Sequence, residues 1–245
     1  MNLTDKVALV TGGARRVGRA VALRLAEAGC HVMITFNTSA DEAAQTVADI
    51  TALGRRAWCA KIDLASPSAP RQIVRHLKRG ADRLDVLVHN AAVYRPTPWG
   101  KLTREDWYEH IRVNATAPVM ITQALADLLA ADGGGRVIHF LDAHLLDHSR
   151  RNYLAYSVSK AALLEATHCL AREMAPHVTV NAIAPGVVDW AEDMTAKQRK
   201  AYLQQIPLGR AGTVDDAAGA VLFLARDADY LTGQIIRLDG GRTLT

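Results

Sequence analysis

The chain has 245 residues, of which 49% are hydrophobic and 22% are charged, a composition typical of one globular α/β domain. No run of about eighteen apolar residues occurs, which excludes a membrane-spanning helix. Residues 1–6 lack the pattern of a signal peptide, which favours the cytoplasm. The net charge is +4, but the arginines are scattered without interleaved aromatic residues, so a nucleic-acid-binding surface is not expected.

Short runs rich in valine, isoleucine and leucine alternate with amphipathic stretches along almost the whole chain. The apolar runs predict strands at residues 7–11, 31–36, 57–62, 86–89, 136–141, 179–183 and 234–238. The amphipathic stretches predict helices near residues 17–28, 41–53, 70–80, 103–131, 153–175 and 214–226. Continuous apolar runs indicate strands buried on both faces, as in a parallel sheet.

This alternation predicts one doubly wound, Rossmann-like α/β domain over residues 1–245, with a seven-stranded parallel sheet and helices on both faces. Residues 187–212 do not follow this alternation of apolar strands and amphipathic helices. A long polar excursion after the carboxyl end of a strand commonly covers a site, so this segment is expected to cover the substrate.

A glycine-rich turn joins the first predicted strand to the first predicted helix. It reads Thr11-Gly12-Gly13-Ala14-Arg15-Arg16-Val17-Gly18. Glycines at such a turn let backbone N–H groups approach a pyrophosphate at the helix N-terminus. A merely structural turn is the alternative. The position favours a dinucleotide site whose candidate residues are Gly12, Arg15, Arg16, Val17 and Gly18.

The turn after the second predicted strand indicates which dinucleotide binds. A carboxylate there would bind the adenine ribose of NAD and repel a 2′-phosphate. The chain instead has Asn37-Thr38-Ser39, with Arg15 nearby on the phosphate loop. A neutral polar turn beside a guanidinium favours NADPH. The same turn can also cap the following helix.

Tyr156 and Lys160 are four residues apart in a helical pattern, so their side chains can share one site. A nearby ammonium is expected to lower the pKa of the Tyr156 phenol, so that it can transfer protons near neutral pH. On its own this pattern also fits a solvated helix face.

Taken together, the motifs resemble the short-chain dehydrogenase/reductase family over essentially the whole chain. They are the phosphate loop, Asp63-Leu64, His89-Asn90-Ala91-Ala92, Asn114, Tyr156 with Lys160, Asn181-Ala182-Ile183-Ala184-Pro185-Gly186, and Asp239-Gly240-Gly241. The resemblance implies a nicotinamide cofactor, hydride transfer and a homotetramer. It implies that Asn114 holds a water in a proton relay and that Lys160 binds the nicotinamide ribose. It adds Asp63, Leu64, Asn90, Ala91, Pro185, Gly186 and Val188 to the expected cofactor site.

Three departures from the usual family pattern resemble the pteridine reductase branch. Asp142 stands where a catalytic serine is usual, Arg16 replaces the middle glycine of the loop, and the aromatic Tyr94 follows the fourth-strand motif. Simpler interpretations remain open: Asp142 as a turn cap, Tyr94 as an ordinary loop residue, and Arg16 as a ligand of the cofactor phosphates alone. Trp190 either closes the pocket or packs structurally.

The expected function is NADPH-dependent hydride transfer to a pterin-type C=N bond of a dihydropterin or dihydrofolate. Asp142, Tyr156, Lys160 and Asn114 are the predicted catalytic residues. The predicted substrate contacts are Arg16, Tyr94, Asp142, Tyr156 and Trp190, and no metal is expected. One alternative is a general carbonyl or 3-ketoacyl reductase. A second is a cofactor-binding regulatory protein that has lost turnover.

Overall fold

Buried parallel strands form the centre of the structure. The computed structural model describes residues 1–131, 133–146, 150–190 and 194–244. The strands are β1 (Val7–Thr11), β2 (His31–Phe36), β3 (Ala57–Lys61), β4 (Val86–His89), β5 (Gly135–Phe140), β6 (Val178–Pro185) and β7 (Ile235–Leu238). Within the described residues they form one seven-stranded sheet in the order β3-β2-β1-β4-β5-β6-β7, and each pair of neighbouring strands is parallel. The predicted Rossmann-like α/β fold is therefore confirmed.

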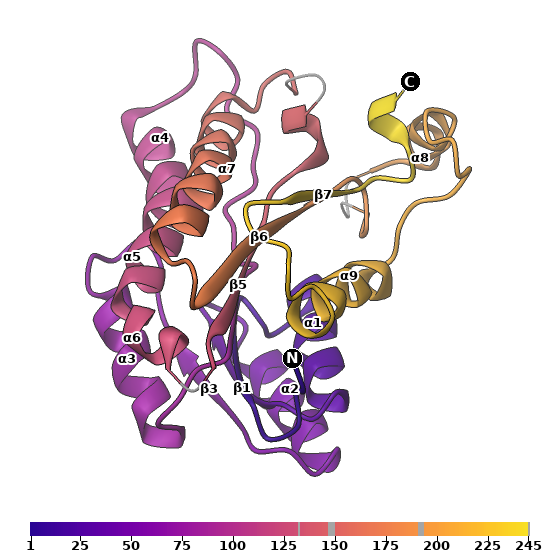
Figure 1. Cartoon of the computed structure of the whole chain (residues 1–245). Helices are drawn as coiled ribbons and strands as arrows, with labels where there is room; N and C mark the ends of the chain where they lie inside the picture. The colour runs from indigo at the N-terminus through magenta and orange to yellow at the C-terminus, as the bar shows by residue number, and fades with distance from the viewer. Residues whose placement is uncertain (132, 147–149, 191–193, 245) are drawn as a thin grey trace.

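Helices cover both faces of this sheet (Figure 1). One layer contains α1 (Arg16–Glu27), α2 (Ala40–Ala52) and α9 (Val214–Arg226). The other contains α3 (Ala69–Gly80), α4 (Arg104–Ile111), α5 (Ala117–Ala124), α6 (Ala126–Ala130) and α7 (Leu154–Glu173). Each layer has its own apolar core against the sheet, because side chains alternate between the two faces of every strand. In β1, for example, Val10 belongs to one core and Leu9 to the other.

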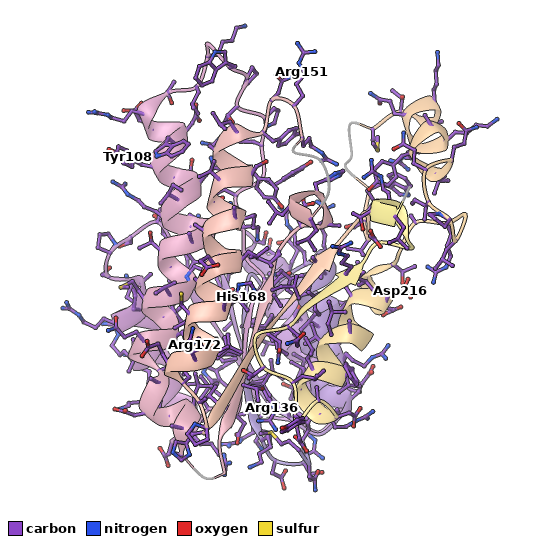
Figure 2. The ribbon with its side chains drawn as sticks, turned by 45° about the horizontal axis from the view of Figure 1, so that its top comes forward. Tyr108, Arg136, Arg151, His168, Arg172 and Asp216 are labelled. Atoms are coloured by element: carbon purple, nitrogen blue, oxygen red, sulfur yellow. The ribbon has the colours of Figure 1, made fainter. Side chains whose placement is uncertain are left out.

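The strand order reverses beside β1, because β2 pairs with one edge of β1 and β4 with the other. The connections from these strands therefore leave in opposite directions, and a crevice opens at their carboxyl ends. Figure 2 shows the two ends of the sheet: Arg136 at the amino end of β5, and Arg151 beyond its carboxyl end. The functional site is expected at the carboxyl end.

Three predicted elements differ from the structure. The stretch 103–131 is not one helix but α4, a π-helical turn at Arg112–Thr116, α5 and α6. The segment 187–212 contains the helix α8 (Ala196–Leu203), which has no strong apolar face to reveal it in the sequence; Thr195 caps its first turn. Strand ends differ by up to two residues, the largest shift being β6, which extends to Pro185. No helix in the described part of the chain is long and apolar enough to cross a membrane.

Candidate active site

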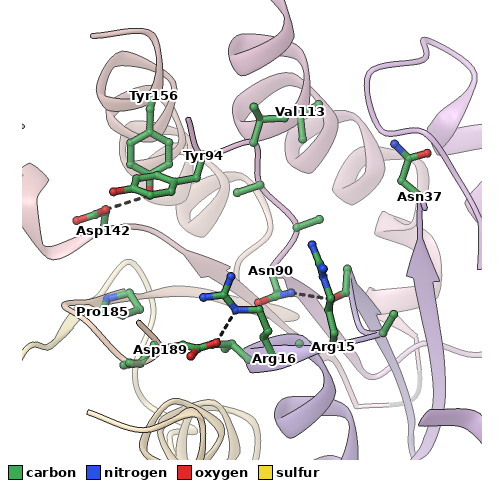
Figure 3. Close-up of a pocket in the computed structure, with 18 of the residues that line it drawn as sticks. Arg15, Arg16, Asn37, Asn90, Tyr94, Val113, Asp142, Tyr156, Pro185 and Asp189 are labelled. Atoms are coloured by element: carbon green, nitrogen blue, oxygen red, sulfur yellow. Dashed lines mark hydrogen bonds and ion pairs between the residues drawn. The ribbon is translucent and has the colours of Figure 1, made fainter. Parts of the chain in front are cut away.

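A cleft of about 590 Å³ lies at the carboxyl ends of the strands. Nearly all the residues predicted for the site line it: Gly12, Arg15, Arg16, Val17, Gly18, Asn37, Thr38, Ser39, Asp63, Leu64, Asn90, Ala91, Tyr94, Asp142, Tyr156, Pro185, Gly186, Val188 and Trp190. Figure 3 shows the phosphate loop on one side and Asp142 with Tyr156 on the other. Lys160 and Asn114 do not line the cleft; both are buried behind its wall.

The glycines of the phosphate loop are required by close packing. Gly12 has a φ of +64°, a conformation that favours glycine. A Cβ added to Gly18 would overlap the Gly12 carbonyl oxygen and lie 2.5 Å from Nδ2 of Asn90. Asn90 donates from this Nδ2 to the carbonyl oxygens of Thr11 and Gly12, both at 3.0 Å. The turn after β4 is thus hydrogen-bonded to the loop after β1, which fixes the floor of the cleft.

One end of the cleft carries an unneutralised positive charge. Arg15 is exposed there, and within the described residues its guanidinium has no ion-pair or hydrogen-bond partner. Asn37, Thr38 and Ser39 line the same cleft and are neutral. Ser39 occupies the position before α2 but its side chain makes no capping hydrogen bond. These side chains are therefore available to a ligand, and an anionic group suits them best.

Arg16 has a different environment. It begins α1 with a φ of +54°, and its Nε donates to Oδ2 of Asp189 at 2.5 Å. Its Nη2 donates to the backbone oxygen of Trp190 at 3.4 Å. The loop after β1 is thereby joined to the segment after β6. Contact between Arg16 and a substrate or cofactor phosphate stays a prediction.

Asp142 and Tyr156 form a direct pair in the cleft (Figure 3). The Tyr156 hydroxyl donates to Oδ2 of Asp142 at 3.0 Å. The other carboxylate oxygen of Asp142 accepts from the backbone N–H of His144 at 2.9 Å. The carboxylate thus caps a turn, as the simpler interpretation expected, and also faces the phenol. The two expectations for Asp142 are compatible.

The expected effect of Lys160 on Tyr156 is wrong. Burial raises the pKa of Tyr156 well above its ordinary value, and the Asp142 carboxylate raises it further because it repels a tyrosinate and accepts the phenol's hydrogen bond. Lys160 is not among the groups that oppose this shift, and its Nζ donates to the backbone oxygen of Phe140 at 2.5 Å. Burial lowers the pKa of Lys160 to about 8, while Asp142 opposes that shift. Tyr156 is therefore a protonated donor at neutral pH.

Asn114 stabilises the wall of the cleft. Its amide exchanges two hydrogen bonds with the backbone of Val93, at 2.8 and 2.9 Å, and donates to the Ser159 hydroxyl at 3.0 Å. It lies in the π-helical turn, a feature frequent at functional sites. Both N–H groups of the Asn114 amide are used by these contacts, and a role for Asn114 in a proton relay stays a prediction.

Aromatic side chains surround the catalytic pair. The Tyr94 ring lines the cleft, is 43% exposed and meets Tyr156 edge-on, with centroids 4.8 Å apart. It also stacks on Tyr153, with centroids 4.9 Å apart. Trp190 packs edge-on against Tyr202 at 5.8 Å, and both line the cleft. Tyr94 thus combines packing with partial exposure, whereas Trp190 lines the cleft and packs against Tyr202.

Several lining residues were not predicted individually, notably Asp189, His144, Arg150, Met194 and Tyr202, although three of them belong to the segment 187–212 that was expected to cover the substrate. They come from the loop after β5 and from the segment after β6. These loops carry no recognisable motif, so only the fold places them at the cleft. The available signal was position alone, since both loops follow the carboxyl ends of strands.

Comparisons with known proteins agree with this architecture. Residues 12–243 match the family model described as enoyl-(acyl carrier protein) reductase. The chain is 36% identical to a 3-oxoacyl-[acyl-carrier-protein] reductase of Synechocystis sp. over 247 residues, covering 99% of this chain and 98% of the relative. A putative short-chain alcohol dehydrogenase from Sinorhizobium meliloti superposes with a TM-score of 0.93 at 32% identity, covering 100% and 98%. The angucycline C-6 ketoreductase LanV with bound NADP superposes at 0.92 and 34% identity, covering 100% and 98%.

These relatives do not confirm the pteridine reductase branch. Their names describe reduction of 3-oxoacyl groups and ketones, which agrees better with the alternative of a carbonyl or 3-ketoacyl reductase. The broader expectation is confirmed by the family model, by the extent of sequence identity and by the superposed structures. The chain belongs to the short-chain dehydrogenase/reductase family.

Proposed function

We propose that this chain is an NADPH-dependent reductase whose substrate is the C=N bond of a dihydropterin-type ring. The observation that carries the substrate class is the hydrogen bond from Tyr156 to the Asp142 carboxylate at 3.0 Å. A general carbonyl or 3-oxoacyl reductase is the second candidate, and the names of the relatives favour it. Both candidates share the cofactor and differ in the acceptor bond.

The cleft fits NADPH. Gly12 and Gly18 line the cleft at the N-terminus of α1, where a pyrophosphate is favoured, and Arg15 offers an unneutralised guanidinium beside the neutral Asn37–Ser39 turn. A bound NADPH would supply the hydride. Pro185, Gly186 and Val188 line the part of the cleft expected beside the nicotinamide. Lys160 is the proposed ribose partner, which requires its buried amine to reach the cleft from behind the wall, where it donates to the Phe140 carbonyl.

Replacing Arg15 tests this cofactor choice. We expect Arg15→Gln to lower the ratio of kcat/KM for NADPH over NADH by about 10- to 100-fold, because charge-assisted hydrogen bonds to the 2′-phosphate are lost. Steady-state kinetics with both cofactors measures the ratio. Arg75→Gln on the exposed face of α3 removes the same charge outside the cleft and should leave it unchanged. An unaltered ratio in Arg15→Gln would remove Arg15 from the cofactor site.

The Asp142–Tyr156 pair suits protonation of nitrogen. When hydride reaches the carbon of a C=N bond, the nitrogen must gain one proton. Tyr156 is protonated at neutral pH and is hydrogen-bonded to the carboxylate, so the pair can pass that proton directly or through water. In ketone reduction an alkoxide develops instead, and an adjacent carboxylate would repel it. The pair therefore favours the C=N substrate.

The walls of the cleft suit a flat ring. The half-exposed Tyr94 ring can stack on a pterin, adding about 0.5–1.5 kcal/mol beyond the burial of apolar surface.

The alternative of a regulatory protein without turnover is less favoured, because Tyr156 and Lys160 occupy one helix behind the cleft and Asn114 supports its wall.

Following NADPH absorbance with three substrates tests the proposal. We expect oxidation of NADPH with dihydrobiopterin or dihydrofolate, and little with an acetoacetyl thioester. Consumption only with the thioester would replace the pterin assignment by the second candidate. Consumption with none, together with measurable NADPH binding, would favour the regulatory protein.

The titration of Lys160 predicts a pH dependence. Its pKa is lowered to about 8 by burial, so the ammonium is present below that pH and is lost as pH rises through it. We expect kcat/KM for NADPH, which reports groups of the free enzyme, to fall above about pH 8. Tyr156 does not account for this limb, because its pKa is raised well above 10.0. A profile that stays flat from pH 6 to about pH 9.5 would contradict the role of Lys160.

A homotetramer is the proposed assembly. Leu154 and Val158 on α7 are 39% and 37% exposed, and Trp99 beside them is 84% exposed. Such an apolar surface suits contact with a second copy of the chain. Analytical ultracentrifugation measures the assembly, and a monomer at micromolar concentration would contradict it.

A further inference from the structure

Arg150 lies on the wall of the cleft next to the catalytic pair. It enters from the loop between β5 and α7, and its side chain is partly buried. One Nη group donates to the Tyr94 hydroxyl, and the other lies 2.9 Å from Nε2 of His144. Since Tyr94 in turn meets Tyr156 at 4.8 Å, Arg150 is one aromatic ring away from the reacting end of the cleft.

The guanidinium of Arg150 is held in a fixed orientation. Its carbon Cζ lies 5.7 Å from the centroid of Tyr94 and 5.4 Å from that of Tyr153. The two rings are themselves stacked. Cation–π contacts and the two hydrogen bonds therefore restrain a side chain that would otherwise have much rotamer freedom. A restrained, planar donor group loses little entropy when it binds a ligand.

No carboxylate neutralises Arg150 in the part of the chain that the structure describes. Its polar contacts are a phenol and an imidazole. Another guanidinium that lines the cleft, that of Arg16, is paired with Asp189 at 2.5 Å. A partly buried cation without a counter-ion is costly, and a bound anion would remove that cost. The positive charge of Arg150 already acts on the catalytic pair, because it opposes the increase in the pKa of Tyr156.

We propose that Arg150 selects substrates that carry a carboxylate or phosphate group away from the reacting bond. This inference rests on the proposed function and specifies the substrate class. Asp142 at the reacting end repels an anion, whereas Arg150 attracts one, so the two charges together orient the substrate. A planar ring with an acidic tail would place the ring at Tyr156 and the tail at Arg150.

Two substrates with the same reducible ring and different tails test the inference. Dihydrofolate carries the carboxylates of its glutamate, and dihydrobiopterin has an uncharged side chain. We expect Arg150→Gln to lower kcat/KM for dihydrofolate about 10- to 100-fold and to change that for dihydrobiopterin less than about threefold. Arg150→Lys should recover part of the loss. Arg151→Gln is the matched control, because it removes the same charge from a residue that is exposed at the outer edge of the molecule (Figure 2).

Equal losses with both substrates, or no loss with either, would overturn the inference and leave the proposed function intact. Failure of the proposed function is recognised separately, because the unmodified enzyme would then reduce neither pterin. In that case acetoacetyl-CoA, with its phosphates, and uncharged ethyl acetoacetate allow the same comparison for ketone reduction. If nothing is turned over, calorimetric binding of dihydrofolate and dihydrobiopterin to the NADPH complex gives the same discrimination. The thermal midpoint of each variant shows that it is folded.

Discussion

Asp142→Ser is expected to lower kcat for dihydropterin reduction by at least about 100-fold and to leave the Kd for NADPH within about threefold. The carboxylate accepts the Tyr156 hydrogen bond at 3.0 Å, and it is the only described acceptor of that hydroxyl. A serine hydroxyl neither carries the negative charge nor relays a proton to nitrogen with the same acidity. Cofactor affinity should persist, because the phosphate loop and Arg15 are on the other side of the cleft (Figure 3).

Stopped-flow measurement of NADPH oxidation, with a fluorescence titration of NADPH, separates these two effects. Asp127→Ser on the exposed surface of α6 is a suitable control, because it makes the same change outside the cleft. Unchanged turnover of dihydropterin in Asp142→Ser would show that the carboxylate takes no part in the reaction. Reduction of a ketone that appears or increases in this variant would show that the carboxylate had excluded such substrates.

Gly18→Ala is the second change with a large expected effect. The new Cβ would overlap the carbonyl oxygen of Gly12 and crowd Nδ2 of Asn90. Backbone atoms cannot move aside as a flexible side chain can, so α1 must shift away from the loop. We expect a loss of about 2–4 kcal/mol in the free energy of unfolding and at least about tenfold weaker NADPH binding.

Chemical denaturation and NADPH titration measure both quantities. Gly219→Ala in α9 is the matched control, because a Cβ added there meets nothing within 4 Å. Replacing a helical glycine in open space by alanine raises the free energy of unfolding by about 1 kcal/mol. The free energy of unfolding should therefore fall in Gly18→Ala and rise in Gly219→Ala. A Gly18→Ala variant as stable as the unmodified chain would contradict the close packing of α1 against the loop.

Elements with a strong local signal were predictable. The apolar strands, the glycine-rich loop and the order of motifs led to the fold and to most of the cleft, since parallel strands bring their carboxyl ends to one edge. The break at Arg112–Thr116 was not predictable, because its residues continue the helical pattern of their neighbours. The geometry of the catalytic residues could not be predicted from the sequence either. Spacing placed Lys160 near Tyr156, but only the folded chain directs its amine to the Phe140 carbonyl.

Contacts between distant segments were the least predictable. Arg16 and Asp189 are 173 positions apart, and no motif connects them. Arg150 likewise carries no family signal, and its environment depends on Tyr94 from another loop. The proposed substrate class rests on such contacts between distant segments, whereas the family rests on motifs that can be read directly in the sequence.

The Arg16–Asp189 ion pair bears on the kinetic order of the reaction. A dinucleotide phosphate arriving at the loop would compete with Asp189 for the same guanidinium. Loss of that ion pair would free the backbone after Pro185 to rearrange over the second ligand. This competition therefore favours an ordered mechanism, in which the coenzyme binds first and leaves last.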